Sequence, residues 1–189
     1  MPRAHIALDL ETLSTTPDAK IISIGAVAIC ETTGDKRSFY RVVSAGSQGR
    51  SHESQSTLKW WAGQSPEARV TFEESLYGNA QPINEALKEL TDWIAAIGET
   101  HNDVFVWGNG ATFDVTILES AYYNYNGMFV PWNFRKVRDM RTLYEITNMF
   151  KMGDEIRASV QRTGTHHNAL DDADYQARIV IRSMQLLRD

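Results

Sequence analysis

The stretch from Ile6 to Thr12, IALDLET, constrains the fold of this chain more than any other. It is typical of a buried β-strand that ends in two acidic residues. Side chains alternate across a strand, so Asp9 and Glu11 point to the same face. The apolar residues around them indicate a strand that is covered on both faces. Two carboxylates placed there repel each other and lose hydration, which destabilises the fold unless a cation lies between them.

A divalent cation would relieve that repulsion, because Mg²⁺ and Mn²⁺ favour carboxylate oxygen. The alternative is a strand that runs into a polar loop, where both acids are solvated. Asp-x-Glu is a short and common string, so the pair alone does not decide between them.

The apolar pattern predicts a single α/β domain over residues 1–189, a length sufficient for a substantial core. Three strands should form an antiparallel meander, at 6–10, 20–30 and 38–43. A polar loop at 45–56 follows, and then strands and helices alternate around a mixed central sheet. We expect the later strands at 103–107 and 136–138, and helices at 57–64, 66 onward, 82–97, 112–125, 140–149 and 168–187. Residues 150–164 have no clear period and are expected to be irregular.

The apolar pattern and the cysteine content indicate a cellular compartment. The longest apolar stretch, residues 21–30, is too short to span a bilayer, so we expect no membrane partner. The N-terminus lacks the apolar core of a signal peptide. The single cysteine, Cys30, excludes an intramolecular disulfide and suits a reducing compartment. We therefore expect a cytoplasmic protein.

Two further acids stand near predicted helix starts. Asp114 follows the predicted strand at 103–107, and Asp172 lies near the start of the last helix. Each alone is an ordinary first-turn acid that suits the helix dipole. His167 precedes Asp172 by five residues, which would place the two side chains about 140° apart on one helix. They can share a site only if His167 lies in the loop before that helix.

Three segments, in this order, carry a resemblance to a known family: DLET at 9–12, NGATFD at 109–114 and HNALDDA at 167–173. Together they resemble the three motifs of the DEDD (DnaQ-like) 3′–5′ exonuclease superfamily, in its histidine subtype, DEDDh. The segment STLKWWAGQSPEAR at 56–69 is similar to phage-type 3′–5′ exonucleases, in the company of ribonuclease AS-like exoribonucleases. The resemblance implies a ribonuclease-H-like fold.

The resemblance also implies roles for five residues. The carboxylates that match the metal-binding positions are Asp9, Glu11, Asp114 and Asp172, and His167 matches the general base. Two Mg²⁺ or Mn²⁺ ions about 3.5–4 Å apart can stabilise both the attacking water and the leaving 3′-oxygen. A histidine can accept the proton of that water near neutral pH. Asp171 competes with Asp172, since both lie off the apolar face of the helix, and the motif favours Asp172.

The implied activity is metal-dependent hydrolysis at single-stranded 3′ ends of DNA or RNA, which releases 5′-mononucleotides. The side chains expected to contact that end are Thr12, Leu13, Trp60, Trp61 and Phe113. Adjacent helical positions diverge by about 100°, so one tryptophan should pack in the core and the other lie nearer the cleft. Leu13 could contact a terminal base or could equally pack in the core.

Charge leaves the choice of substrate open. The net charge is −5, and without the four assigned acids 20 acidic residues remain against 19 basic ones. A basic run of Arg135, Lys136, Arg138 and Arg141 lies beside aromatic residues. It could hold phosphates, or it could be an ordinary solvated face.

Two other functions remain open from the sequence. One is a non-catalytic nucleic-acid-binding module of the same fold, which would have no reason to keep all four carboxylates and the histidine. The other is a phosphodiesterase of dinucleotides or small nucleotides. A homodimer is a further expectation, because several relatives of this subtype are dimers. Its aromatic surface would come from Tyr122, Tyr123, Tyr125, Trp132 and Phe134, unless these fill the chain's own core.

Overall fold

A five-stranded mixed sheet forms the centre of the computed structural model, which describes residues 3–98, 103–127 and 129–188. The strand order is β3-β2-β1-β4-β5. The strands are β1 (Ala4–Thr12), β2 (Ile21–Cys30), β3 (Lys36–Val42), β4 (Val104–Gly108) and β5 (Val137–Asp139). The first three are antiparallel, and β4 and β5 run parallel to β1. This confirms the predicted meander followed by alternating strands and helices.

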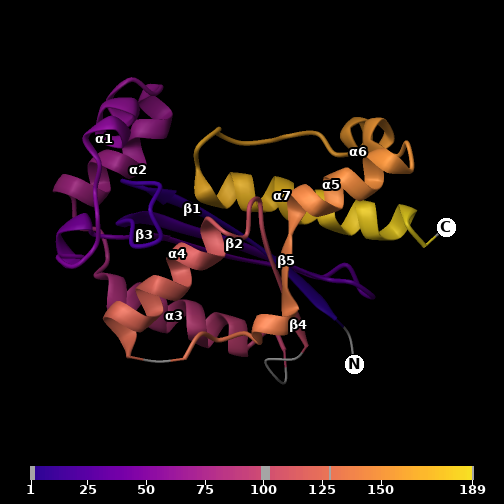
Figure 1. The fold of residues 1–189 in the computed structure, drawn as a ribbon, viewed down its shortest axis with the longest axis horizontal. Helices are drawn as coiled ribbons and strands as arrows, with labels where there is room; N and C mark the ends of the chain where they lie inside the picture. The colour runs from indigo at the N-terminus through magenta and orange to yellow at the C-terminus, as the bar shows by residue number, and fades with distance from the viewer. Residues whose placement is uncertain (1–2, 99–102, 128, 189) are drawn as a thin grey trace.

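Helices cover both faces of the sheet (Figure 1). They are α1 (Gln55–Ala62), α2 (Pro66–Tyr77), α3 (Ile83–Ala95), α4 (Asp114–Ala121), α5 (Met140–Met149), α6 (Gly153–Ser159) and α7 (Ala169–Leu186). Short turns are η1 (Ala45–Ser47), the π-helical η2 (Tyr122–Asn126) and η3 (Phe134–Lys136). In Figure 1, α5, α6 and α7 lie on one side of the sheet and α3 and α4 on the other. Among the described residues, no helix combines the length and apolar character that a membrane crossing needs.

The prediction for residues 150–164 was wrong in part, because α6 occupies the middle of this segment. The helix has seven residues, and only Gly153 and Ile156 are buried. Two buried positions are too few to give a periodic apolar pattern in the sequence. The predicted helix at 112–125 is also shorter, since α4 ends at Ala121 and a π-helical turn follows.

Strand β1 lies in the middle of the sheet and is buried along both faces, as predicted. Ile6 and Leu8 pack into the core under α3 and α4. Ala7 points the other way, against Ala173 and Ala177 of α7. These small side chains let the helix lie close to the strand, so the position of α7 is set by β1 and β2.

The two adjacent tryptophans divide as predicted. Trp61 is fully buried, and its indole Nε1 donates a hydrogen bond of 2.9 Å to the Thr12 carbonyl oxygen. Trp60 is 43% exposed. Leu13 is also fully buried, in the same cluster as Trp61, so it belongs to the core.

The aromatic residues considered for a dimer surface also divide. Tyr122 and Trp132 are buried in the core, and the Tyr125 hydroxyl is hydrogen-bonded to the 50–51 loop. Tyr123 and Phe134 are exposed. The homodimer itself stays a prediction, now with only part of its expected surface.

Gly25 allows the closest approach between α7 and the sheet. It lies on β2 directly opposite Asp9 of β1. A Cβ atom at this position would lie 2.1 Å from the carbonyl oxygen of Ala169 and 2.5 Å from the backbone nitrogen of Leu170. Because both neighbours are backbone atoms, only a shift of the helix could make room for a side chain.

We predict that Gly25→Ala destabilises the fold by at least about 1–3 kcal/mol, the usual cost of overpacking. Urea unfolding measures this change. Gly49→Ala is the matched control, since nothing lies within 4 Å of a Cβ there, and it should change stability by less than about 0.5 kcal/mol. Equal stability of the two variants would contradict the close approach.

Candidate functional site

Strands β1 and β4 bring two parts of the chain to one edge of the sheet. They are parallel neighbours, so their carboxyl ends lie side by side. Asp9 and Glu11 lie at this end of β1, and α4 begins at Asp114 shortly after β4. The backbone N–H of Leu10 donates to the Asp114 carboxylate at 3.2 Å. This bond ties the start of α4 to the strand that carries the acid pair.

The start of α7 brings a fourth carboxylate to the same place. Carboxylate oxygens of Asp9, Glu11 and Asp172 all lie within 4.8 Å of one another. Gln176, one turn along α7, donates a hydrogen bond of 2.6 Å to Asp9. Asp171 turns away and accepts a hydrogen bond of 2.7 Å from the Thr165 backbone. The structure therefore brings Asp172 to the cluster, while its neighbour holds the preceding loop.

His167 lies in that loop, before α7 begins, as the five-residue spacing requires. Its φ of 64° is in the left-handed region, and its backbone N–H donates to Asp172 at 3.2 Å. The ring of Trp60 meets the imidazole edge-on, with centroids 4.9 Å apart. Burial lowers the pKa of His167, and the charges of His166 and Arg162 lower it further. The imidazole is therefore neutral, and able to accept a proton, near neutral pH.

The clustered acids resist ionisation in the protein alone. Burial, and after it the charges of Asp114 and Glu11, raise the pKa of Asp9 well above its usual value. Burial and the charge of Asp114 raise the pKa of Glu11 to about 8. Burial raises the pKa of Asp114 to about 7, against the opposing effects of backbone hydrogen bonds and the Arg141 charge. Without a bound cation, these acids therefore favour the protonated state.

A divalent cation fits this donor set. The ligand atoms are carboxylate oxygens, which hard cations prefer, and burial and mutual repulsion disfavour the ionised acids without one. A cation of the chain itself reaches the site, since Arg162 forms an ion pair with Asp172. That guanidinium also lies over the ring of Tyr175, 5.1 Å from its centroid.

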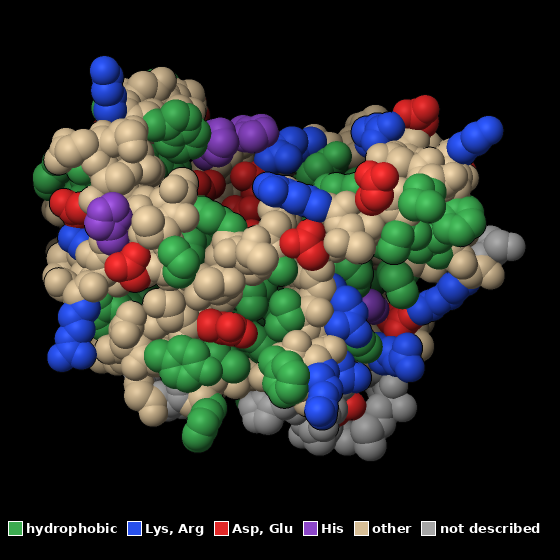
Figure 2. All heavy atoms as spheres, viewed as in Figure 1, with side chains coloured by type: hydrophobic (Ala, Val, Ile, Leu, Met, Phe, Trp, Pro, Cys, Tyr) green, Lys and Arg blue, Asp and Glu red, His purple; other side chains and the backbone are tan. Residues whose placement is uncertain are grey.

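The carboxylates lie in a cavity of about 340 Å³. Figure 2 shows acidic side chains at the bottom of a hollow, with histidine side chains at its rim. The lining includes all five residues assigned from the motifs, Asp9, Glu11, Asp114, His167 and Asp172. It also includes Phe113.

A second cavity, of about 400 Å³, adjoins the first through Leu10, Glu11 and Phe113. Thr12, Trp60, Trp61 and Phe113 line it, so four of the five residues expected to contact substrate meet there. Leu13 does not line either cavity, because it packs beneath Trp61 in the core.

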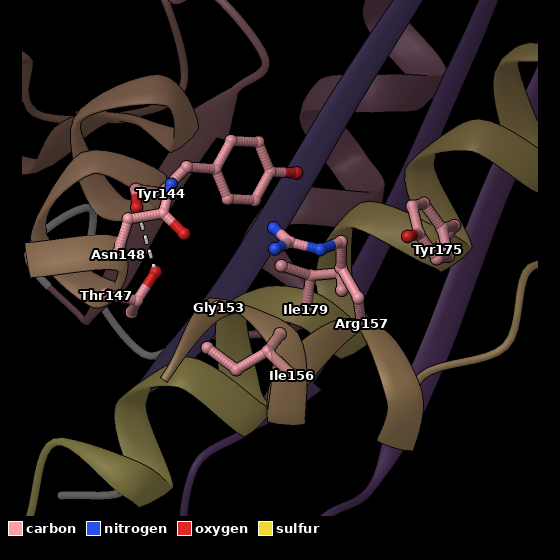
Figure 3. Close-up of a pocket in the computed structure, with 8 residues that line it drawn as sticks. All are labelled: Tyr144, Thr147, Asn148, Gly153, Ile156, Arg157, Tyr175 and Ile179. Carbon is pink, nitrogen blue, oxygen red and sulfur yellow. Dashed lines mark hydrogen bonds between the residues drawn. The ribbon is translucent and has the colours of Figure 1, made fainter. Parts of the chain in front are cut away.

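A third cavity, of about 370 Å³, lies between α5, α6 and α7 and shares Tyr144 and Tyr175 with the first. Figure 3 shows the Tyr144 hydroxyl and the Arg157 guanidinium directed into it. The sequence analysis missed these tyrosines, Arg162 and Gln176. Gln176 could have been found, since it follows Asp172 by one helical turn. Arg162 lies in a segment with no pattern and gave no signal.

The raised pKa values predict how stability depends on pH in the metal-free protein. The folded chain holds protons on Glu11 and Asp114 at pH values where the unfolded chain has lost them. The free energy of unfolding should therefore fall as pH rises from about 4.5 to about 8. We expect a loss on the order of 5 kcal/mol or more, measured by urea unfolding in EDTA.

Glu11→Gln should flatten this dependence, whereas Glu145→Gln, on the exposed face of α5, should leave it unchanged. Stability of the wild-type chain that is constant from pH 5 to pH 8 in EDTA would contradict the raised pKa values.

Solved structures show the same fold. The nuclease domain of 3′hExo, a DEDDh family member bound to rAMP, has 16% identity and a TM-score of 0.68, with 97% of this chain and 92% of that chain covered. Cell-death related nuclease 4 (CRN-4) has 16% identity and a TM-score of 0.70, but this chain spans only 65% of its length. Exonuclease I from Methylocaldum szegediense has 13% identity and a TM-score of 0.60, with 99% and 41% covered. The predicted ribonuclease-H-like fold is confirmed.

Sequence comparison gives the family. No curated protein sequence matched the chain. The family model of the Rv2179c-like 3′–5′ exoribonuclease domain matches residues 4–184, nearly the whole chain. That span includes all three motifs and the loop with His167. The chain therefore belongs to the Rv2179c-like family of 3′–5′ exoribonuclease domains, and it is a 3′–5′ exonuclease.

Proposed function

We propose that the chain hydrolyses phosphodiester bonds at single-stranded 3′ ends and releases 5′-mononucleotides. RNA is the first substrate to test, because the family is described as exoribonucleases, and DNA is the second. One observation supports this proposal most strongly. Carboxylates from β1 and α7 lie within 4.8 Å of one another, in a cavity that also holds Asp114 and His167.

Four carboxylates would hold two Mg²⁺ or Mn²⁺ ions: Asp9, Glu11, Asp114 and Asp172. When bound, such ions supply Lewis-acid activation of water and neutralise charge on the phosphate and the leaving oxygen. The chain's contribution is a rigid set of oxygen ligands. The Leu10 and Gln176 hydrogen bonds orient Asp114 and Asp9, and Arg162 must leave Asp172 when a cation takes its place.

His167 is the proposed general base. Its lowered pKa keeps the imidazole neutral, and its backbone bond to Asp172 places it at the edge of the acid cluster. It accepts the proton that the attacking water loses. Trp60 packs against the imidazole ring and restricts its orientation.

The second cavity is proposed to hold the terminal nucleotide. It opens beside Glu11, and the half-exposed ring of Trp60 forms one wall. Stacking of a base on an aromatic ring contributes roughly 1–3 kcal/mol. Trp61 supports this wall from the core, and Thr12 and Phe113 complete it. No substrate contact is proposed for Leu13.

End-labelled oligonucleotides test this function. In Mg²⁺, a 5′-labelled RNA 20-mer with a free 3′-hydroxyl should give a ladder that shortens from the 3′ end, and EDTA should stop it. A 3′-phosphate should slow the reaction, while a 5′-phosphate should not. Asp172→Asn should lower the rate at least about a hundredfold, and Asp171→Asn considerably less. Cleavage of a closed circle, or hydrolysis of dinucleotides only, would contradict the proposal.

Adjacent histidines provide a matched test of the base. His167→Asn should lower kcat by roughly two to four orders of magnitude, the usual range for a general base. Asparagine tolerates the left-handed backbone at this position, so the loop should keep its shape. His166→Asn, at the exposed neighbouring residue, should cost far less. If His166→Asn were the more damaging change, the base assignment would be wrong.

A further inference from the structure

Three cations surround one aromatic ring at the edge of the sheet. The ring is that of Phe105 on β4. Lys136 Nζ lies 4.7 Å from its centroid, and the guanidinium carbons of Arg138 and Arg3 lie at 5.0 and 5.9 Å. The cations come from η3, β5 and the residue before β1. We call these four residues the Phe105 patch.

The three cations of this patch form no ion pair with the described part of the chain. None of the ion pairs between described residues includes Arg3, Lys136 or Arg138. Cation–π attraction to one ring is small beside the mutual repulsion of three like charges in a partly buried place. An anion over the patch would relieve that repulsion.

A buried histidine beneath the patch responds to this charge. His5 stacks on Phe105 with centroids 5.2 Å apart. Burial is the main reason that the pKa of His5 falls to about 4. The charges of Arg188, Arg3 and Arg138 contribute next. The Glu31 carboxylate forms an ion pair with Arg188 and lies 3.7 Å from His5 Nε2. The positive charges therefore lower the pKa of His5 although the Glu31 carboxylate is near.

Strand β5 leads from the patch to the loop before Asp114, where Arg141 adds one further cation. Arg138 lies opposite Trp107 in the parallel pairing of β4 and β5. The next residue, Asp139, accepts a hydrogen bond of 2.6 Å from the Ala111 backbone, in the loop that leads to Asp114. Arg141 lies against Gly110 in that same loop, and its charge acts on Asp114.

The patch lies along β4 from the end of that strand that leads to Asp114. Phe105 stands three residues before Gly108 at the end of β4, which is about 10 Å along the strand. Figure 2 shows Lys and Arg side chains gathered at the lower right of the molecule, over β4 and β5. Beside them Phe134 is 73% exposed, with the Arg135 guanidinium 5.1 Å from its ring centroid. Cations next to an exposed aromatic ring are what single-stranded nucleic acids bind.

We propose that the Phe105 patch, with Phe134 and Arg135 beside it, binds the part of a single-stranded substrate that lies upstream of the scissile bond. This inference rests on the proposed function. The cations hold backbone phosphates, and Phe134 offers a stacking surface. A substrate longer than a few nucleotides reaches the patch, whereas a dinucleotide held in the catalytic cavities does not. In a chain with net charge −5, the patch also provides a local positive surface that attracts a polyanion.

The test compares two substrate lengths in two matched double variants. Arg3→Gln with Lys136→Gln removes two charges from the patch. Arg138 is kept, because it donates hydrogen bonds to the Arg135 and Val137 carbonyls. The control is Arg37→Gln with Lys88→Gln, which removes two charges from exposed positions on β3 and α3.

The patch variant should lower kcat/KM for an RNA 20-mer by roughly three- to tenfold and leave kcat/KM for a dinucleotide unchanged. The slope of log kcat/KM against log salt for the 20-mer should become shallower by about 1.4, or about 0.7 for each lost phosphate contact. The control variant should show neither change.

Equal losses on both substrates, or no loss beyond the control, would overturn the inference while leaving the proposed function intact. A wild-type chain that digests neither substrate would overturn both. Thermal melting of each variant shows whether a loss comes from unfolding instead.

Discussion

The repulsion between buried carboxylates is the constraint on which the rest of this structure depends. Asp9 and Glu11 lie on the central strand, which is largely buried on both faces, at the bottom of the cavity that all four acids line. Their high pKa values show how unfavourable the ionised pair is without a cation. The two acids stay together only if the surrounding backbone, which we call the frame, cannot move apart. The parallel pairing of β1 with β4 and the close approach of α7 at Gly25 provide that frame.

The acids and the proposed base differ in how firmly the backbone holds them. The acids stand on β1 and at the starts of α4 and α7, and hydrogen bonds from Leu10, Gln176 and His167 hold Asp114, Asp9 and Asp172 in turn. The proposed base instead lies in a loop with a left-handed residue, tied to α7 through Asp171 and Asp172. Arg162 enters from the same loop region and pairs with Asp172. A chain cation thus lies where a divalent ion is proposed to bind.

Aromatic and basic residues extend this centre in two directions. On one side, Trp60 and Phe113 line a cavity of a size and character that suit a terminal nucleotide. On another, Arg141 begins a series of cations that reaches Phe105 along β5. The net charge of the chain gives no hint of this series, because acids elsewhere outnumber the bases. Local arrangement, and not the total, determines where an anion can bind.

The sequence by itself determined most of the order of strands and helices along the chain, and its motifs named the acids that are proposed as metal ligands. Alternation in β1, helical periods and the three spaced motifs are local signals, and local signals survive in a single sequence. It did not reveal α6, which buries two residues only. It left Leu13, Asp171 and the basic run with two interpretations each. The tertiary structure placed Leu13 in the core and turned Asp171 toward Thr165. It also brought Arg3 and Lys136, 133 residues apart in sequence, to the same Phe105 ring. Such contacts are decided by packing between distant segments, which no local pattern records.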